Sequence, residues 1–267
     1  MSLKQQTLKA VDYFASCAFA FNSKMPSYFY GEWLWLSKRS WTSIYLRYEA
    51  NTARIISTNL NLGDTFWDVG ANIGLFSLYA SKIVGPTGKV VSFEPAPETF
   101  ELLSANVRGC ETIQALPYGI GNENSNTLMS VQGASTGASF VKEVVELSQI
   151  YHKDTPLIQV PVSIYKMDTL PGKINSRPNL IKIDIEGFEV EALRGAENIL
   201  DEFRPILVIE IHPLQLSMCG SHENEVFDLL RRHDYDYEVF NRDEKWALFS
   251  IIARPRQPAL RSSGGVH

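Results

Sequence analysis

The sequence predicts an α/β fold in which helices cover a doubly wound, mostly parallel sheet. From Thr65 onward, short apolar runs typical of strands alternate with segments whose apolar residues recur at helical spacing. Strands joined by helices favour parallel pairing with right-handed crossovers. Residues 237–240 and 246–252 instead indicate a closing hairpin around 241–245. A sheet of this kind binds its ligand beyond the carboxyl ends of its strands.

The expected elements follow in order. Short apolar runs predict strands at residues 65–69, 89–93, 112–116, 180–185 and 206–211. Helices are expected at 75–84, ending at Gly85-Pro86, from Pro97 to Gly109, from 186 to Pro205, and near 223–232. Residues 121–165 are rich in Asn, Ser, Gly and Thr and break this rhythm. We expect an insertion with some strand content near the binding face; a loop without a function is the alternative.

Length and composition indicate one globular domain with an extension. Of the 267 residues, we assign 61–255 to the α/β domain, 1–60 to an N-terminal helical extension and 256–267 to a mobile tail. A hydrophobic content of 45% and a charged content of 21% exclude intrinsic disorder. No apolar run approaches the roughly 18 residues of a membrane span. The start of the chain faintly resembles a signal peptide, but Asp12 interrupts its apolar stretch, which favours a mature helix.

Charge and cysteine usage limit partners and compartment. The net charge of −5 divides into a basic first 60 residues and an acidic remainder, which argues against a nucleic-acid partner. The three cysteines, Cys17, Cys110 and Cys219, form neither a metal-binding pair nor a disulfide framework, so a reducing, cytoplasmic location is expected. The aromatic residues of the extension have three interpretations, which are core packing, a cap over the acceptor pocket, and contact with a membrane surface through Lys and Trp.

The first motif joins the first strand of the α/β domain to its first helix and runs from Asp68 through Gly70, Ala71 and Asn72 to Gly74. Gly70 permits a tight turn and lets a ligand approach the backbone, and Gly74 lets the helix and strand pack closely. Amides at the start of a helix favour a negatively charged ligand group. The pattern Gly-x-Asn-x-Gly lacks two glycines of the dinucleotide fingerprint, which disfavours a pyrophosphate.

The second motif is Glu94-Pro95, which ends the next strand 26 residues after Asp68. An acidic residue at this position is placed to accept hydrogen bonds from two ribose hydroxyls. Its charge also disfavours a ribose that carries a 2′-phosphate. A glycine-rich turn and a surface Glu are the bland alternative to this cofactor site.

Charged residues interrupt two strands that are otherwise apolar. Lys182 and Asp184 lie in the first of these strands, and Glu210 and His212 lie in the second. Residues two apart share one face of a strand, and buried charges are costly unless they are paired. The alternatives are a buried Lys182–Asp184–Glu210 network, a Glu186 that only favours its helix N-terminus, and a His212 that only precedes Pro213.

The segments DVGANIG, VVSFEP, LIKIDIEGFEVEALRGA and LVIEIH resemble the FkbM-type family of S-adenosylmethionine-dependent methyltransferases. The resemblance covers approximately residues 49–255. It implies a class I methyltransferase fold of seven strands, the last antiparallel, and methyl transfer to a hydroxyl of a sugar, glycoconjugate or natural product. It also implies that Asp68, Gly70, Asn72 and Gly74 hold the methionine end of the cofactor and that Glu94 holds its ribose. S-adenosylhomocysteine is then the product.

Methyl transfer to a hydroxyl mainly requires alignment of the acceptor and removal of its proton. His212 is the best-tuned general base, and Asp184 or Glu210 could orient it or act directly, with Glu186 nearby. A divalent metal held by Asp184, Glu186 and Glu210 is conceivable, but spacing alone does not establish it. We expect a small-molecule, sugar or lipid-linked acceptor. A nicotinamide-dependent oxidoreductase and a non-catalytic adenosyl-ligand or scaffold protein are the alternative functions.

Overall fold

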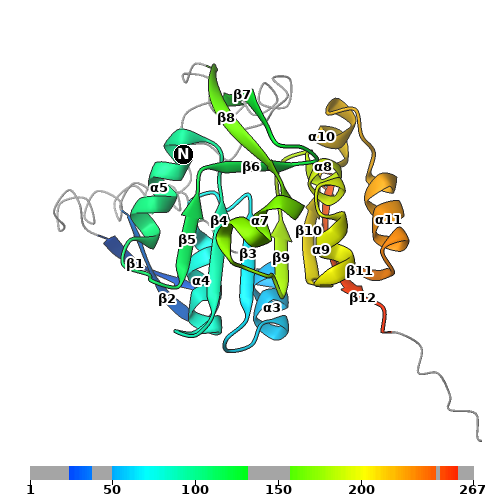
Figure 1. Cartoon of the computed structure of the whole chain (residues 1–267). Helices are drawn as coiled ribbons and strands as arrows, with labels where there is room; N and C mark the ends of the chain where they lie inside the picture. The colour runs from blue at the N-terminus through cyan, green and yellow to red at the C-terminus, as the bar shows by residue number, and fades with distance from the viewer. Residues whose placement is uncertain (1–23, 38–49, 132–156, 245–246, 258–267) are drawn as a thin grey trace, which may run out of the picture.

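A computed structural model describes residues 24–37, 50–131, 157–244 and 247–257 of the chain. Its centre is a seven-stranded sheet in the order β11-β12-β10-β9-β3-β4-β5 (Figure 1). Five strands pair in parallel, namely β3 Thr65–Val69, β4 Lys89–Phe93, β5 Ile113–Leu116, β9 Leu180–Ile183 and β10 Ile206–Ile211. β12 Leu248–Pro255 is antiparallel to both β10 and β11 Tyr235–Asp243. The predicted sheet and its C-terminal hairpin are confirmed.

Helices cover both faces of this sheet. One face carries α3 Ala50–Asn59, α4 Leu75–Val84 and α5 Pro97–Val107. The other carries the 3-10 turn Met167–Thr169 and the helices α7 Leu170–Ile174, α8 Glu189–Arg194, α9 Glu197–Glu202, α10 Pro213–Met218 and α11 Glu223–Arg232. None of the helices in these described residues is long and apolar enough to cross a membrane.

The single helix expected from 186 to Pro205 is two short helices, α8 and α9. The chain breaks at Gly195, where a Cβ atom would lie 1.9 Å from the carbonyl oxygen of Gly121. That oxygen belongs to β6 Tyr118–Gly121, so the break lets a second sheet approach the helix. The apolar periodicity continues through both helices, which is why the sequence alone does not reveal the interruption.

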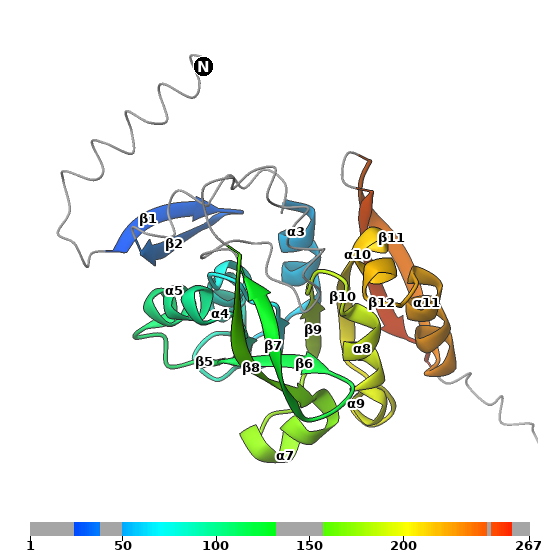
Figure 2. The same ribbon diagram turned by 90° about the horizontal axis from the view of Figure 1, so that it is seen from above.

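The described part of the insertion at 121–165 contributes to this second sheet. β8 Ile158–Lys166 lies between β6 and β7 Ser125–Val131 (Figure 2). The side chains of Met129, Val131 and Val162 form a cluster with Ala96, two residues after Glu94. The second sheet therefore stands beside the carboxyl end of β4. Residues 132–156 of the expected insertion lie outside the described residues.

The helical prediction for residues 1–60 is wrong for residues 24–37. They form an antiparallel hairpin of β1 Lys24–Phe29 and β2 Glu32–Ser37, and α3 supplies the helix that follows later. The burial of β2 alternates with period two, since Leu34 and Leu36 are buried while Trp33 and Trp35 are exposed. The aromatic content of the segment suits a strand better than a helix. The expectations for 1–23 and 38–49 fall outside the described residues.

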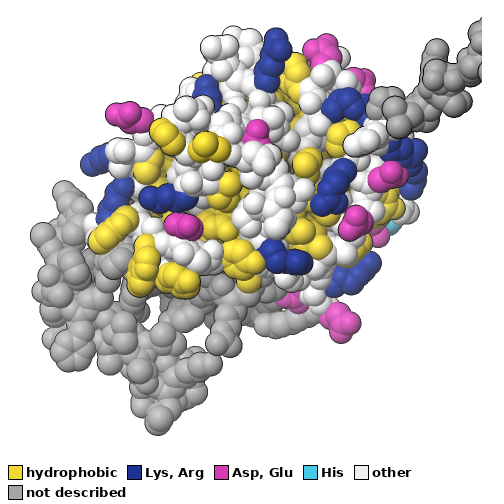
Figure 3. All heavy atoms as spheres, turned by 90° about the horizontal axis from the view of Figure 1, so that it is seen from below, with side chains coloured by type: hydrophobic (Ala, Val, Ile, Leu, Met, Phe, Trp, Pro, Cys, Tyr) yellow, Lys and Arg dark blue, Asp and Glu magenta, His cyan; other side chains and the backbone are white. Residues whose placement is uncertain are grey.

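The exposed tryptophans of the hairpin lie away from the carboxyl ends of the sheet. Trp33 and Trp35 border a cavity of about 560 Å³ together with Gly85, Pro86 and Thr112. These three residues follow α4 or precede β5, so they lie toward the amino ends of the parallel strands. Hydrophobic side chains are scattered among charged ones over the lower face of the molecule (Figure 3). These two tryptophans therefore do not cap an acceptor pocket beyond β9 and β10.

Candidate active site

The loop after β3 is a turn built on residues with left-handed backbones. Gly70, Asn72 and Gly74 have φ values of 79°, 50° and 85°. The amides of Gly70 and Ala71 both donate to the carbonyl oxygen of Phe93 at 3.0 Å, which fastens the loop to the end of β4. Gly74 then precedes α4, so the first amides of this helix point toward the carboxyl edge of the sheet.

The two glycines serve contacts other than those expected. A Cβ atom on Gly70 would lie 1.9 Å from the carbonyl oxygen of Asp184, so this glycine admits the backbone that follows β9 rather than a ligand. A Cβ atom on Gly74 would lie 2.5 Å from Leu103 of α5, so the close packing is between helices. Both positions still demand glycine because their φ values lie in the left-handed region.

A buried asparagine connects this loop to the hairpin, a contact that the sequence analysis missed. Asn106 of α5 donates from Nδ2 to the carbonyl oxygen of Ile73 at 2.7 Å and accepts from the Ser37 amide at 2.6 Å. Lys24 also donates to the carbonyl oxygen of Asn106 at 2.6 Å. A polar residue on the buried side of an otherwise amphipathic helix is the only sequence signal for this role.

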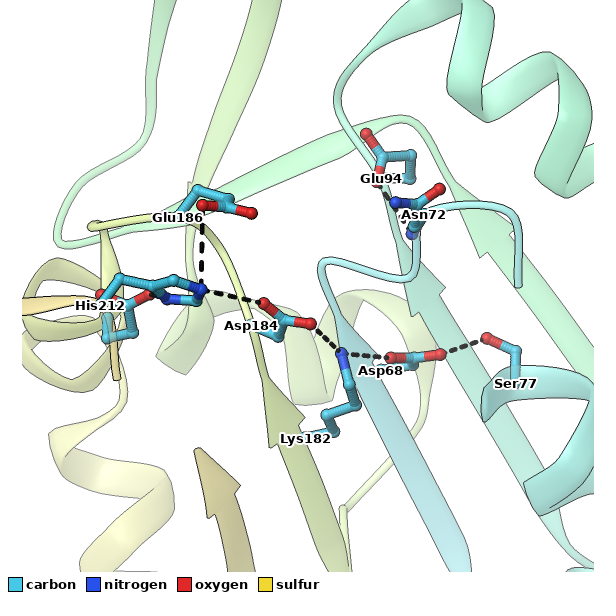
Figure 4. Close-up of polar contacts among 9 residues, drawn as sticks. Asp68, Asn72, Ser77, Glu94, Lys182, Asp184, Glu186 and His212 are labelled. Carbon is cyan, nitrogen blue, oxygen red and sulfur yellow. Dashed lines mark hydrogen bonds and ion pairs between the residues drawn. The ribbon is translucent and has the colours of Figure 1, made fainter. Parts of the chain in front are cut away.

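Glu94 lies beside the loop, as the cofactor hypothesis requires (Figure 4). Its carboxyl accepts hydrogen bonds from the amides of Asn72 and Ala96, each at 3.0 Å. Burial raises the pKa of Glu94 to about 7, despite the opposing effect of these two hydrogen bonds. A buried carboxyl that faces the turn suits the recognition of neutral hydroxyl donors. Pro95 separates Glu94 from Ala96 and holds the chain in an extended form before α5.

Asp68 lies beneath the loop rather than at its surface. It is completely buried, accepts a hydrogen bond from Ser77 at 2.6 Å and pairs with Lys182 at 3.8 Å. Burial raises its pKa, an effect that the charge of Lys182 opposes. Lys182 also donates to Asp184 at 3.1 Å. The alternative for Lys182 was a buried network with Asp184 and Glu210. The contact of Lys182 with Asp184 is present, and Asp68 is a further partner, so Lys182 links the ends of β3 and β9.

The polar residues predicted at the ends of β9 and β10 lie close together. The ligand atoms of Asp184, Glu210 and His212 lie within 4.8 Å of one another. Glu186 joins them, with Oε2 3.8 Å from Nε2 of His212. Glu186 does not open the next helix, because it has a left-handed φ of 53° three residues before α8. Its carboxyl faces His212, and burial raises its pKa to about 7. The cluster residues are Asp184, Glu186, Glu210 and His212.

Glu189 is the functional candidate that the sequence analysis missed. This first residue of α8 is completely buried, and it accepts hydrogen bonds from Nδ1 of His212 at 2.9 Å and from the Gly187 amide at 3.0 Å. The signal was available, because Glu189 stands three residues before Ala192 on the apolar face of the predicted helix. A carboxyl group at the end of such a face is a buried charge that needs a partner.

The surroundings of His212 do not suit a free general base. Burial lowers its pKa, but the hydrogen bond to Glu189 and the charges of Glu186, Glu189 and Asp184 outweigh that effect and raise it well above the usual value. A protonated imidazole cannot accept a proton. Asp184 has a lowered pKa, because Lys182 and His212 overcome the effect of its burial. The candidate for the general base is therefore the cluster of carboxyl and imidazole groups rather than His212 alone.

Comparison with known sequences identifies the family. The family model of the methyltransferase FkbM domain matches residues 68–237, which contain the loop, Glu94 and the whole cluster. The chain belongs to the FkbM methyltransferase family. It is an S-adenosylmethionine-dependent methyltransferase, which removes the nicotinamide alternative.

Two curated relatives act on different acceptors. The chain is 28% identical over 213 residues to the hexuronic acid methyltransferase AglP of Haloferax volcanii, covering 78% of this chain and 79% of that protein. It is 30% identical over 200 residues to the 31-O-demethyl-FK506 methyltransferase FkbM of Streptomyces tacrolimicus, covering 66% and 74%. Aeropyrum pernix fibrillarin, solved with bound S-adenosylmethionine, is 12% identical with a TM-score of 0.50, covering 89% of this chain and 84% of that one. This last similarity supports the class I fold alone.

Proposed function

We propose that this FkbM-family protein transfers the methyl group of S-adenosylmethionine to a hydroxyl oxygen of a sugar, glycoconjugate or natural product. One observation carries the proposal. The four cluster residues meet beyond the ends of β9 and β10, next to the loop that the resemblance to the family assigns to the cofactor. The printed names of the two relatives, a hexuronic acid methyltransferase and an O-demethyl-FK506 methyltransferase, support the same class of acceptor.

The residues at the carboxyl edge fit the two halves of the cofactor. The amides that open α4 suit the carboxylate of the methionine moiety, because a helix N-terminus attracts a negative group. Glu94 suits the ribose, because one of its oxygens accepts from Asn72 in the turn and the other accepts from Ala96 after the end of β4, which holds the carboxyl beside the turn. Asp68 acts from below, where its ion pair with Lys182 holds the strand ends in place. The cofactor supplies an activated methyl group on a positively charged sulfur.

The cluster would position the acceptor and receive its proton. The acceptor hydroxyl donates a hydrogen bond to a carboxyl oxygen of Asp184 or Glu210, which orients the oxygen lone pair toward the methyl carbon. A carboxyl group of the cluster would receive the hydroxyl proton as the acceptor oxygen takes the methyl group, which S-adenosylmethionine would supply from its positively charged sulfur to leave S-adenosylhomocysteine. Holding the two reactants in line supplies most of the rate enhancement in such a displacement. The hydrogen bond between His212 and Glu189 holds the imidazole in its orientation within the cluster.

The test has two stages. Thermal unfolding is first followed with S-adenosylhomocysteine or NAD added, and only S-adenosylhomocysteine is expected to raise the midpoint. Purified protein and methyl-labelled S-adenosylmethionine are then incubated with uronic acids, neutral sugars, lipid-linked saccharides and macrocyclic alcohols. Label in a base-stable methyl ether supports the proposal. Label in a carboxyl ester or an amine would contradict it, as would cofactor binding without transfer to any of these acceptors.

A further inference from the structure

The cluster residues present a ligand set for a cation as well as for an acceptor hydroxyl. The ligand atoms of Asp184, Glu210 and His212 lie within 4.8 Å of one another. Three ligand atoms bound at about 2.1 Å to one ion lie about 3.0–3.6 Å from one another. The longest separation in the cluster therefore has to shorten by about 1–2 Å for the three side chains to share an ion. One imidazole nitrogen and two carboxylate oxygens form a donor set that suits Mn²⁺ or Zn²⁺ better than Ca²⁺.

The orientation of His212 is an independent indication. Its side chain is 3% exposed, and Nδ1 donates to the buried carboxylate of Glu189. This bond directs Nε2 into the cluster, where it lies 3.9 Å from Asp184 Oδ1 and 3.8 Å from Glu186 Oε2. Both distances are too long for a hydrogen bond. A histidine whose far nitrogen donates to a carboxylate while its near nitrogen faces other ligands has the arrangement found at metal sites.

The charge balance of the cluster points the same way. Its three carboxyl groups contact one fixed cation, Lys182, and His212, which is neutral when it acts as a metal ligand. The carboxyl oxygens of Asp184 and Glu210 lie within 4.8 Å of each other, and a shared cation would stabilise two carboxyl groups at this separation. Lys182 takes one oxygen of Asp184, and the other oxygen faces His212. A divalent ion would neutralise the remaining negative charge where the sheet ends.

We propose that Asp184, Glu210 and His212 bind one divalent transition-metal ion, Mn²⁺ or Zn²⁺, and that the acceptor hydroxyl occupies an open position on it. The inference rests on the proposed function, whose site it deepens. Three protein ligands leave positions free for an exogenous oxygen, as in catalytic rather than structural metal sites. An ion there would favour loss of the hydroxyl proton and fix the acceptor beside the donor methyl group. Glu189 is then a positioning residue, because it acts through His212.

The test measures the metal itself. Full-length protein is stripped with a chelator and titrated with MnCl₂ while the electron paramagnetic resonance signal of free Mn²⁺ is followed. One Mn²⁺ is expected per chain, and Asp184→Asn and Glu210→Gln should each weaken its binding by at least tenfold. Glu189→Gln should weaken it by about 10- to 100-fold, the usual effect of an outer-sphere partner. Asp201→Asn is the matched control, because Asp201 contacts the buried His233 at 2.7 Å in another part of the fold.

Binding of S-adenosylhomocysteine to the stripped wild-type protein separates this inference from the proposed function. Calorimetric affinity for S-adenosylhomocysteine together with no uptake of Mn²⁺ or Zn²⁺ up to about 1 mM would overturn the metal site and leave the proposed function standing. The same holds if Asp201→Asn weakens Mn²⁺ binding as much as Glu189→Gln does. Loss of S-adenosylhomocysteine binding in the stripped wild type would instead count against the proposed cofactor arrangement. Stoichiometric Mn²⁺ uptake that only the cluster variants and Glu189→Gln impair supports the inference.

Discussion

Glu189 accepts a hydrogen bond from Nδ1 of His212 at 2.9 Å, and both side chains are buried. The pair joins the first residue of α8 to the residue that follows β10. Among the described residues, the second oxygen of Glu189 has no hydrogen-bond partner. The charge of Glu189 is therefore compensated mainly through His212, and the orientation of His212 depends on Glu189 in return. The geometry of the cluster residues rests on this contact.

Removal of Glu189 should destabilise the protein strongly. Glu189→Ala leaves His212 buried without its closest partner, which costs about 3–5 kcal/mol in the free energy of unfolding. Glu189→Gln keeps an acceptor oxygen of the same shape and should cost less than half of that. Urea unfolding of both variants measures the difference. Asp228→Asn, which affects an exposed pair with Arg231, is the control and should change stability by less than about 0.5 kcal/mol. Equal losses in all three variants would contradict the role of the pair.

The affinity for S-adenosylhomocysteine should depend on pH through Glu94. The carboxyl needs its charge to accept strongly from ribose hydroxyls, and burial raises its pKa to about 7. Asp68 raises this pKa further and Lys182 lowers it, so both face the group that titrates. Affinity should fall as the pH drops below about 7, by up to about tenfold per unit. Calorimetry from pH 6 to 8 measures this, and Glu94→Gln should bind weakly with a flat profile. A steep profile in Glu94→Gln would assign the titration to another group.

Ionisation of Glu94 should destabilise the ligand-free protein as the pH rises. Because its pKa is raised from 4.5 to about 7 by folding, Glu94 contributes stability that is complete below pH 4.5 and is lost as the pH rises to about 7. The loss is about 1.4 kcal/mol per unit over that interval. Unfolding by urea at several pH values checks the slope, and Glu94→Gln should be less sensitive to pH than the wild type. An unchanged slope in the variant would refute this linkage.

The sequence predicted the sheet well because its strands carry their own local signal. β3, β4 and β9 are short apolar runs between turn residues, and Pro97 opens α5 as expected. The site followed from charges inside such runs, since Asp184 and Glu210 stand where apolar residues are the rule. These predictions needed no knowledge of distant contacts.

The remaining features depend on which segments meet in space. Gly70 carries no mark that it faces the carbonyl of Asp184 rather than a ligand, because 114 residues separate the two positions. The break at Gly195 depends on the approach of Gly121 from the second sheet. For the hairpin, the residues from Trp33 to Leu36 are all apolar, so the sequence does not show that only Leu34 and Leu36 are buried, and the aromatic-rich segment was assigned to a helix.

Gly70 should be far less tolerant of substitution than a glycine with the same backbone in open space. Gly70→Ala combines a φ of 79° with a Cβ atom 1.9 Å from a backbone oxygen. Gly109 has a φ of 85° and no atom within 4 Å of its Cβ position, so Gly109→Ala isolates the backbone strain. We expect Gly109→Ala to cost about 1–2 kcal/mol. Gly70→Ala should cost more than about 4 kcal/mol or prevent folding, as urea unfolding and soluble yield will show. Similar stabilities would mean that the loop after β9 moves freely.

The hairpin should divide into a stabilising face and a dispensable one. Leu34→Ala removes a side chain that is 1% exposed against α4 and α5, and should cost about 2–5 kcal/mol. Trp35, 54% exposed, belongs to the opposite face, and Trp35→Ala should cost about 1 kcal/mol or less. This face lies toward the amino ends of the parallel strands, whereas the cluster residues lie at the carboxyl ends. Trp35→Ala should therefore also leave methyl transfer unchanged. Sedimentation with anionic vesicles, in which the wild type is compared with the double variant Trp33→Ala and Trp35→Ala, measures whether the tryptophans contact a membrane surface. A loss of acceptor affinity in Trp35→Ala would place the acceptor on the hairpin and contradict the proposed site.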